Sequence, residues 1–225
     1  VLLPSFISPV IAMIVAFVGC WVVHKITNSV MDRLNERTFR WGQIGGASLV
    51  SLAHGTNDAQ KTMGVMTLAL LASGHWTSTE SVPVWVKVSA ALAIALGTYL
   101  GGWRIIRTLG KGLVDITPRQ GMASDGSTAA VILAASHLGF ALSTTHVATG
   151  SVLGGGLGRG TNVRWHTAGR MVTAWATTFP IAALIGALTF WLGHALGYTA
   201  GALVVFAILT AASVWMFVRS RQGHV

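Results

Sequence analysis

A short polar segment interrupts an otherwise apolar stretch of the chain. Residues 45–73 are mostly apolar, but their middle reads His54-Gly55-Thr56-Asn57-Asp58-Ala59-Gln60-Lys61. Charges at the centre of a bilayer are costly, so Asp58 and Lys61 should face a cavity or pair with each other. Three positions apart on a helix, they are neighbours, and an internal salt bridge is one interpretation. The other is a substrate or ion site, because glycine-bounded polar breaks in hydrophobic helices form such sites in transporters.

A second polar segment lies in the glycine- and serine-rich stretch 121–158, whose single carboxylate is Asp125. Ser143, Thr144 and Thr145 are consecutive at its predicted tip. Hydroxyls inside membrane helices commonly bond to their own backbone. Three consecutive hydroxyl residues at a helix start, where the backbone N–H groups are free, instead favour binding of an oxyanion. The glycine spacing does not fit G-x-x-x-x-G-K-[ST], which excludes a nucleotide-binding phosphate loop.

The composition identifies the environment of these segments. Of the 225 residues 52% are hydrophobic and 9% are charged, whereas a soluble domain has about 25% charged residues. An all-α integral membrane protein in contact with lipid is therefore expected. The net charge of +9 does not indicate nucleic acid, because lysine and arginine occur in short clusters between apolar runs. The single cysteine, Cys20, excludes an internal disulfide and a cysteine-based metal site.

The apolar runs predict one membrane domain over residues 1–225, with about five transmembrane helices and one re-entrant helical hairpin. The expected elements are a span at 6–30, a broken span at 45–73, a span at 84–106, the hairpin at 121–158, and spans at 171–192 and 196–218. Clusters of lysine and arginine follow the spans at 6–30, 84–106 and 196–218 and the hairpin at 121–158. If these clusters are cytoplasmic, the hairpin must enter and leave on one side, and the C-terminus is cytoplasmic. The chain starts with Val1, which suggests a fragment of a longer protein.

Both polar segments resemble the signatures of the inorganic phosphate transporter (PiT) family. The matching residues are 46–64, centred on Gly55-Thr56-Asn57-Asp58, and Leu142-Ser143-Thr144-Thr145-His146-Val147 followed by Gly150. The resemblance implies a secondary active transporter of inorganic phosphate in the cell membrane, coupled to protons or sodium ions. It also implies two inverted repeats, each with an Asn-Asp motif and a hairpin. This chain has one copy of each and resembles the second, C-terminal repeat of a bacterial low-affinity phosphate permease.

The resemblance implies a role for each motif residue. Asn57, Ser143, Thr144 and Thr145 would bind phosphate, Asp58 and Asp125 would carry the coupling ion, and His54, Gln60, Lys61 and His146 would support them. It implies no bound cofactor and no resident metal. The His-Gly-x-Asn-Asp-x-Gln-Lys form is similar to bacterial proton-coupled members, some of which carry a neutral complex of phosphate with a divalent metal. The missing N-terminal repeat is expected in the same chain or in a partner chain, and a homodimer is left open.

Two other functions fit parts of the pattern. An intramembrane serine hydrolase would use Ser143 as nucleophile and a histidine as base, but the G-x-S-x-G elbow is missing. A channel or structural membrane subunit without ion coupling is the second alternative. The neighbouring threonines favour a binding site over one activated nucleophile, so a transporter rather than an enzyme is expected.

Overall fold

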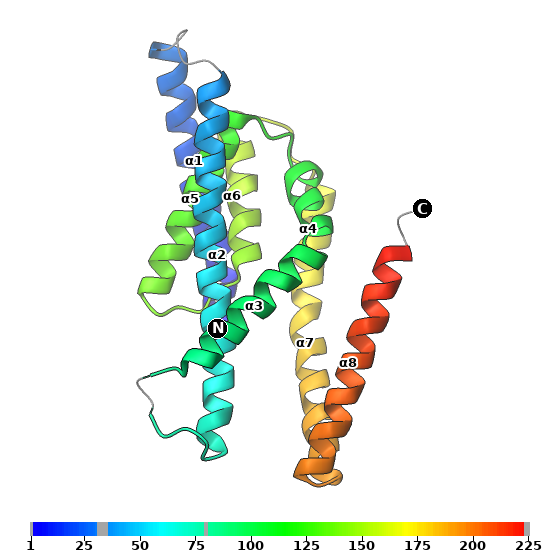
Figure 1. The fold of residues 1–225 in the computed structure, drawn as a ribbon. Helices are drawn as coiled ribbons and strands as arrows, with labels where there is room; N and C mark the ends of the chain where they lie inside the picture. Colours follow the sequence, from blue (N-terminus) through cyan, green and yellow to red (C-terminus); the bar gives the residue numbers. More distant parts are fainter. Residues whose placement is uncertain (1, 31–35, 79–80, 223–225) are drawn as a thin grey trace. The chain divides into compact units, whose positions relative to one another are not determined.

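The computed structural model describes residues 2–30, 36–78 and 81–222, and these residues form helices without a β-strand. The elements are α1 (Leu2–Val30), α2 (Glu36–Ala72), α3 (Val84–Gly101), α4 (Trp103–Arg107), a π-helical turn (Thr108–Gly112), α5 (Pro118–His137), α6 (Thr144–Arg159), α7 (Trp165–Ala195) and α8 (Tyr198–Gln222). The expected all-α fold is confirmed (Figure 1).

The contacts divide the chain into two compact units, residues 1–167 and 168–225. The single membrane domain expected from the sequence over residues 1–225 remains a prediction. Both polar segments lie in the first unit. In the second unit, α7 and α8 are joined by a tight turn at Gly197, whose φ of 80° suits a residue without Cβ.

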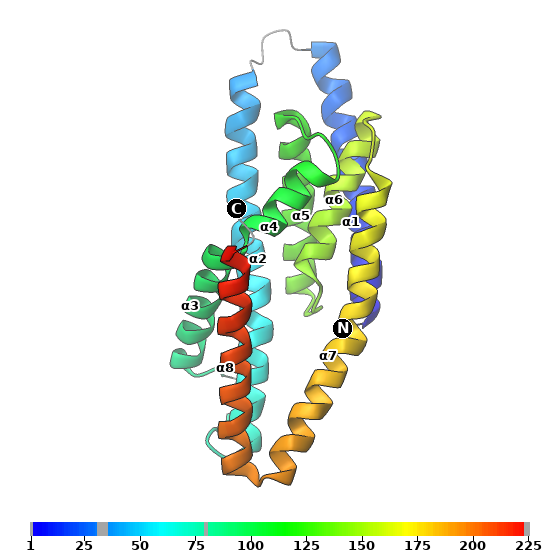
Figure 2. The same cartoon turned by 90° about the vertical axis from the view of Figure 1, so that its right-hand side faces the viewer.

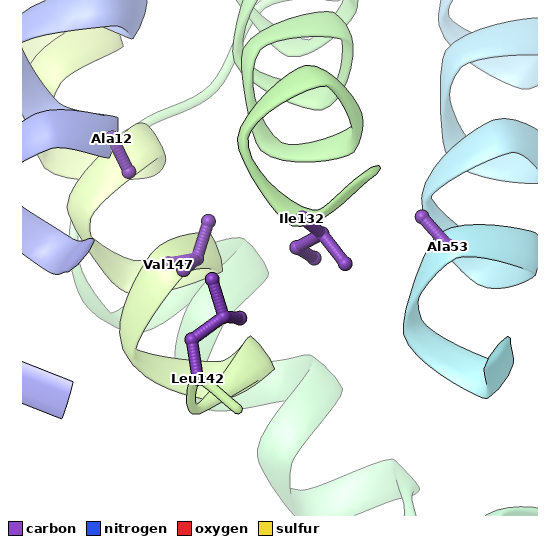
Figure 3. Packing of buried hydrophobic residues seen from close by; sticks show 5 residues of the cluster. All are labelled: Ala12, Ala53, Ile132, Leu142 and Val147. Atoms are coloured by element: carbon purple, nitrogen blue, oxygen red, sulfur yellow. The ribbon is translucent and has the colours of Figure 1, made fainter. Parts of the chain in front are cut away.

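In the first unit, α5 and α6 form the expected helical hairpin, which lies between α1 and α2 (Figures 1 and 2). Helix α6 packs mainly on α1, and α5 packs on α2. A small apolar core joins these helices (Figure 3). It consists of Ala12, Ala53, Ile132, Leu142 and Val147, all of which are buried. The hairpin is thereby fixed against both long helices.

Glycines allow α6 to approach the backbone of α1 very closely. A Cβ added at Gly150, Gly154 or Gly158 would collide with the carbonyl groups of Pro9, Met13 and Phe17, respectively. The glycines recur every four residues and so form one stripe along α6. Such stripes let helices pack backbone to backbone in a membrane, where lipid gives little hydrophobic driving force.

Helix α2 is continuous across the polar segment, where the sequence predicted a broken span. The hydroxyls of Ser51 and Thr56 bond to carbonyls four residues earlier on the same helix. Asp58 is paired with two side chains of α2 itself. Because these polar groups find partners within the helix, unwinding is not needed to satisfy them.

Four of the described helices are long and apolar enough to cross a membrane. The four segments are Leu3–Ile26, Val84–Gly101, Trp165–Ala195 and Thr199–Arg219. The span expected at 84–106 is divided at Gly102, where α3 has ended and the short α4 is about to begin. Helix α2 has 37 residues, or about 55 Å of helix at 1.5 Å per residue, but its polar middle keeps it outside this set. The count of five spans remains a prediction.

Candidate functional site

The middle of α2 meets the turn of the α5–α6 hairpin, so the two polar segments lie together. Asp58 is the centre of this site, and its carboxylate is partly buried. His54 Nε2 lies 2.9 Å from one carboxylate oxygen, and Lys61 Nζ lies 3.0 Å from the other. The three residues are spaced by four and three positions, which places them on one face of α2. The internal ion pair that the sequence allowed is therefore present.

Thr144, the first residue of α6, contacts this group from the hairpin. Its Oγ1 lies 3.1 Å from His54 Nε2 and 3.5 Å from each oxygen of Asp58. The ammonium of Lys61 donates to the carbonyl of Leu142 at 2.6 Å. Lys61 thus bridges the carboxylate of Asp58 and the hairpin turn.

Asn57 provides a second link between α2 and the hairpin. Its Nδ2 donates to the hydroxyl of Ser136, near the end of α5, at 2.9 Å. Only 2% of Asn57 is exposed, and its Oδ1 has no hydrogen-bond partner in the described part of the chain. A cavity of about 170 Å³ lies here, lined by Asn57, Gln60, Lys61, Ser136, Gly139, Phe140 and Ala141. A buried acceptor without a partner beside a cavity indicates room for a donor or a cation.

The first turn of α6 supplies free donors next to this cluster. Ser143 is the N-cap, and its hydroxyl accepts from the backbone N–H of His146 at 3.4 Å. The N–H groups of Thr144 and Thr145 belong to the first turn, where no intrahelical acceptor exists. The partial positive charge of the helix start favours an anion there. The hydroxyl of Thr145 forms no hydrogen bond within the described ranges.

His146 points away from this site and fastens the hairpin to α1. Pro9 has no N–H, so it cannot donate to the carbonyl of Ser5, four residues earlier on α1. His146 Nδ1 lies 3.0 Å from that carbonyl. The ring of His146 thus contacts α1, and its backbone N–H donates to the hydroxyl of Ser143.

Asp125 is not brought to the cluster. It packs against Gly46, where an added Cβ would lie 3.0 Å from the Asp125 Cβ. Gly46 is twelve residues before Asp58 on α2, which corresponds to about 18 Å along the helix. Its role as a coupling-ion residue therefore stays a prediction.

Two groups in the cluster were not expected from the sequence as site residues, the hydroxyl of Ser136 and the carbonyl of Leu142. Ser136 is recognisable only as a polar residue one turn before the hairpin bend. A backbone carbonyl carries no sequence signal. Within the part of the chain that the structure describes, no three His, Cys, Asp or Glu side chains group as metal ligands. The site thus combines one carboxylate with donors suited to an anion.

Comparison with known proteins places the chain among transporters. The phosphate transporter family model matches residues 1–186. A Mycobacterium leprae protein named "Probable low-affinity inorganic phosphate transporter" is 57% identical over 227 residues, which cover 100% of this chain and 55% of that protein. A Bacillus subtilis protein of the same name is 40% identical, covering 83% of this chain and 56% of that protein.

A solved structure called "The sodium-dependent phosphate transporter" shares the fold, with a TM-score of 0.65 at 24% identity. The match covers 87% of this chain and 60% of that one. The chain spans about half the length of the curated relatives it matches. With its apolar helices it is a multi-pass membrane protein, and the family is one of transporters, not enzymes. Since the family model matches well over half of its residues, the chain belongs to the phosphate transporter family.

Proposed function

We propose that this chain forms one half of a secondary active transporter that moves inorganic phosphate across the cell membrane together with a cation. The observation that carries the proposal is the contact of Thr144, at the start of α6, with the Asp58 carboxylate on α2. An anion held at the helix start and a cation or proton held at Asp58 would be direct neighbours. Their opposite charges would favour simultaneous binding, which is the physical basis of symport.

A second repeat would complete the phosphate site. Phosphate has four oxygens, and the donors near Thr144 come from one side only. The relatives named as phosphate transporters are about twice as long as this chain. The buried Oδ1 of Asn57, with its adjoining cavity, offers a contact for groups from the other half. We expect that half to lie in the same or a partner chain.

We propose a proton rather than a sodium ion as the coupling cation, because a sodium ion would have to displace a basic side chain that already contacts the Asp58 carboxylate. The ammonium of Lys61 already occupies the position next to Oδ1, and His54 lies against Oδ2. A proton on Asp58 would cancel its charge and weaken its hold on Lys61. Lys61 could then face a phosphate at Thr144 and Thr145. Loss of the proton would restore the ion pair and weaken anion binding, so phosphate and proton would leave together.

Replacing Asp58 by asparagine tests this proposal. The amide keeps the shape of the protonated carboxyl group but cannot release a proton, so phosphate binding should persist while gradient-driven accumulation is lost. The measurement is phosphate uptake by the full-length protein in proteoliposomes with an imposed pH gradient. Asp115→Asn is the matched control. It removes a carboxylate whose exposed pair with Arg164 should contribute about 0–1 kcal/mol.

Normal accumulation by Asp58→Asn would contradict the assignment. Accumulation driven by a sodium gradient at equal pH on both sides would identify sodium as the coupling ion and overturn the proton mechanism. Flux that does not saturate with phosphate, and does not respond to either gradient, would instead identify a channel.

A further inference from the structure

A basic cavity lies at the open end of the α5–α6 hairpin, far from the Asp58 cluster. Its volume is about 300 Å³, and it is lined by Cys20, Val23 and His24 of α1, residues 117–120 at the start of α5, and Arg159 at the end of α6. Thr144 and Arg159 stand fifteen residues apart on α6, or about 22 Å. The cavity is thus separate from the site described above.

The start of α5 leaves donors free in this cavity. Pro118 is the first residue of the helix and has no N–H, and the N-cap Thr117 makes no capping hydrogen bond. The hydroxyl of Thr117 instead accepts from Arg159 Nη1 at 2.9 Å. The first-turn N–H groups of Arg119 and Gln120 consequently have no intrahelical acceptor. This helix start carries the partial positive charge that attracts anions.

Gln120 gives an independent indication of a ligand. It lines the cavity and is only 1% exposed. Neither its amide nitrogen nor its amide oxygen has a hydrogen-bond partner among the described residues. Buried amides without partners are rare, because removing them from water without compensation costs free energy. A polar ligand in the cavity would provide a partner.

The charges around the cavity favour an anion. Arg119 and Arg159 both line it, and none of the lining residues is acidic. Asp115, the carboxylate in the neighbouring link, is paired with Arg164 at 2.9 Å. Arg119 also lies over the ring of Phe39, 4.9 Å from its centroid. Planar guanidinium groups bind phosphoryl oxygens with two parallel hydrogen bonds, which suits a tetrahedral oxyanion.

We propose that this cavity binds a phosphoryl anion, supplied by inorganic phosphate or by the headgroup of an anionic lipid. Arg159, the amide nitrogen of Gln120 and the first-turn N–H groups of α5 are its ligands. This site is additional to the phosphate site at Thr144 and does not depend on the coupling mechanism proposed above.

Chemical protection of Arg159 tests the site directly. The full-length protein, in nanodiscs of phosphatidylcholine, is treated with the arginine reagent phenylglyoxal, and modification of each arginine is measured by mass spectrometry. Saturating inorganic phosphate should slow modification of Arg159 about tenfold, because a guanidinium bonded to phosphate is shielded from the reagent. Arg170, outside the cavity, serves as the internal control and should be unaffected.

A second arm distinguishes the two sources of the anion. Nanodiscs containing phosphatidate, without added phosphate, should protect Arg159 if a lipid headgroup is the ligand. Protection by free phosphate alone identifies inorganic phosphate. Arg159 that reacts at the same rate under all conditions overturns the proposal.

Two substitutions of Gln120 test its part in the site. Gln120→Leu keeps the size of the side chain but removes the donor, so about tenfold more ligand should be needed for half protection. Gln120→Glu adds a negative charge and should abolish protection. Lys111→Gln, in the same basic link but outside the cavity lining, is the matched control. Unchanged protection in both Gln120 variants would contradict the proposal.

The outcomes separate this inference from the transport function. If Arg159 is never protected while Asp58→Asn still abolishes accumulation, the cavity is not a phosphoryl site and the transport proposal stands. If Arg159 is protected while Asp58→Asn accumulates phosphate normally, the cavity is a site and the coupling assignment fails.

Discussion

The three neighbouring hydroxyl residues at the hairpin tip have different roles in the structure. Ser143 caps α6, Thr144 contacts His54 and Asp58, and the hydroxyl of Thr145 makes no hydrogen bond among the described residues. From the sequence all three were equivalent candidates for phosphate. Because Thr144 contacts Asp58, we propose that it links the phosphate position to the carboxylate.

Thr144→Val should weaken phosphate uptake at low concentration. Valine keeps the volume of threonine but removes the donor. A lost hydrogen bond to a charged group costs about 1.5–3 kcal/mol, or roughly ten- to a hundredfold in affinity. The measurement is the concentration dependence of phosphate uptake at matched surface expression.

Thr149→Val is the control for this change. The hydroxyl of Thr149 lies on the same helix but donates to the carbonyl of Thr145 at 2.7 Å, which is a local backbone contact. It should therefore alter uptake much less. If both variants are equally affected, the effect is a general consequence of removing hydroxyls from α6, and the anion is not held at Thr144.

At the scale of the elements, the glycine stripe of α6 decides how the hairpin is held. Contact between α1 and α6 takes place backbone to backbone, and His146 contacts the Ser5 carbonyl, to which Pro9 cannot donate. These two features position the hairpin tip. The Asp58 cluster thus depends on an interface that contains none of its own side chains.

Gly154→Ala should destabilise the protein. The added methyl group would collide with the carbonyl of Met13, and overpacking of this kind costs about 1–3 kcal/mol. The midpoint of thermal unfolding, measured in detergent, should fall. Gly126→Ala is the matched control, because nothing lies within 4 Å of its added Cβ and alanine favours the helix. Equal midpoints for the two variants would show that the close approach of α1 and α6 is not needed.

For the whole molecule, the basic links predict the orientation in the membrane. Arg159 donates to Thr117, and the backbone N–H of Arg164 donates to the Leu113 carbonyl at 2.9 Å. The links before and after the hairpin therefore meet at one end of the first unit. From the positive-inside rule we predict that this end is cytoplasmic.

Cysteine labelling in intact cells checks this orientation. In a Cys20→Ala background, a cysteine at Asn162 should resist an impermeant thiol reagent until the cells are permeabilised. A cysteine at Thr77, in the link between α2 and α3, should react at once. Both positions are exposed, so access to the reagent depends on the side of the membrane. Reaction at position 162 from outside would refute the topology.

The membrane class, the helical fold and the two polar segments could be predicted from the sequence alone. Hydropathy and the succession of polar residues are local properties, so 121–158 could be identified as a hairpin and Asp58 as a helix neighbour of Lys61. The sequence did not determine that α2 continues through this segment. Its continuity depends on hydroxyls and ion pairs that are satisfied within the helix. The same polar sequence is compatible with a continuous helix and with a broken one.

Which faces of the helices meet could be seen only in the folded chain. Thr144 reaches Asp58, Asn57 reaches Ser136 and His146 reaches Ser5, across separations in sequence from 79 to 141 residues. Asp125, equally conspicuous in the sequence, lies against Gly46 instead. These pairings follow from the rotation of each helix about its axis, which the glycine contacts and the small apolar core fix. Because such contacts arise between distant segments, no local pattern of residues contains them.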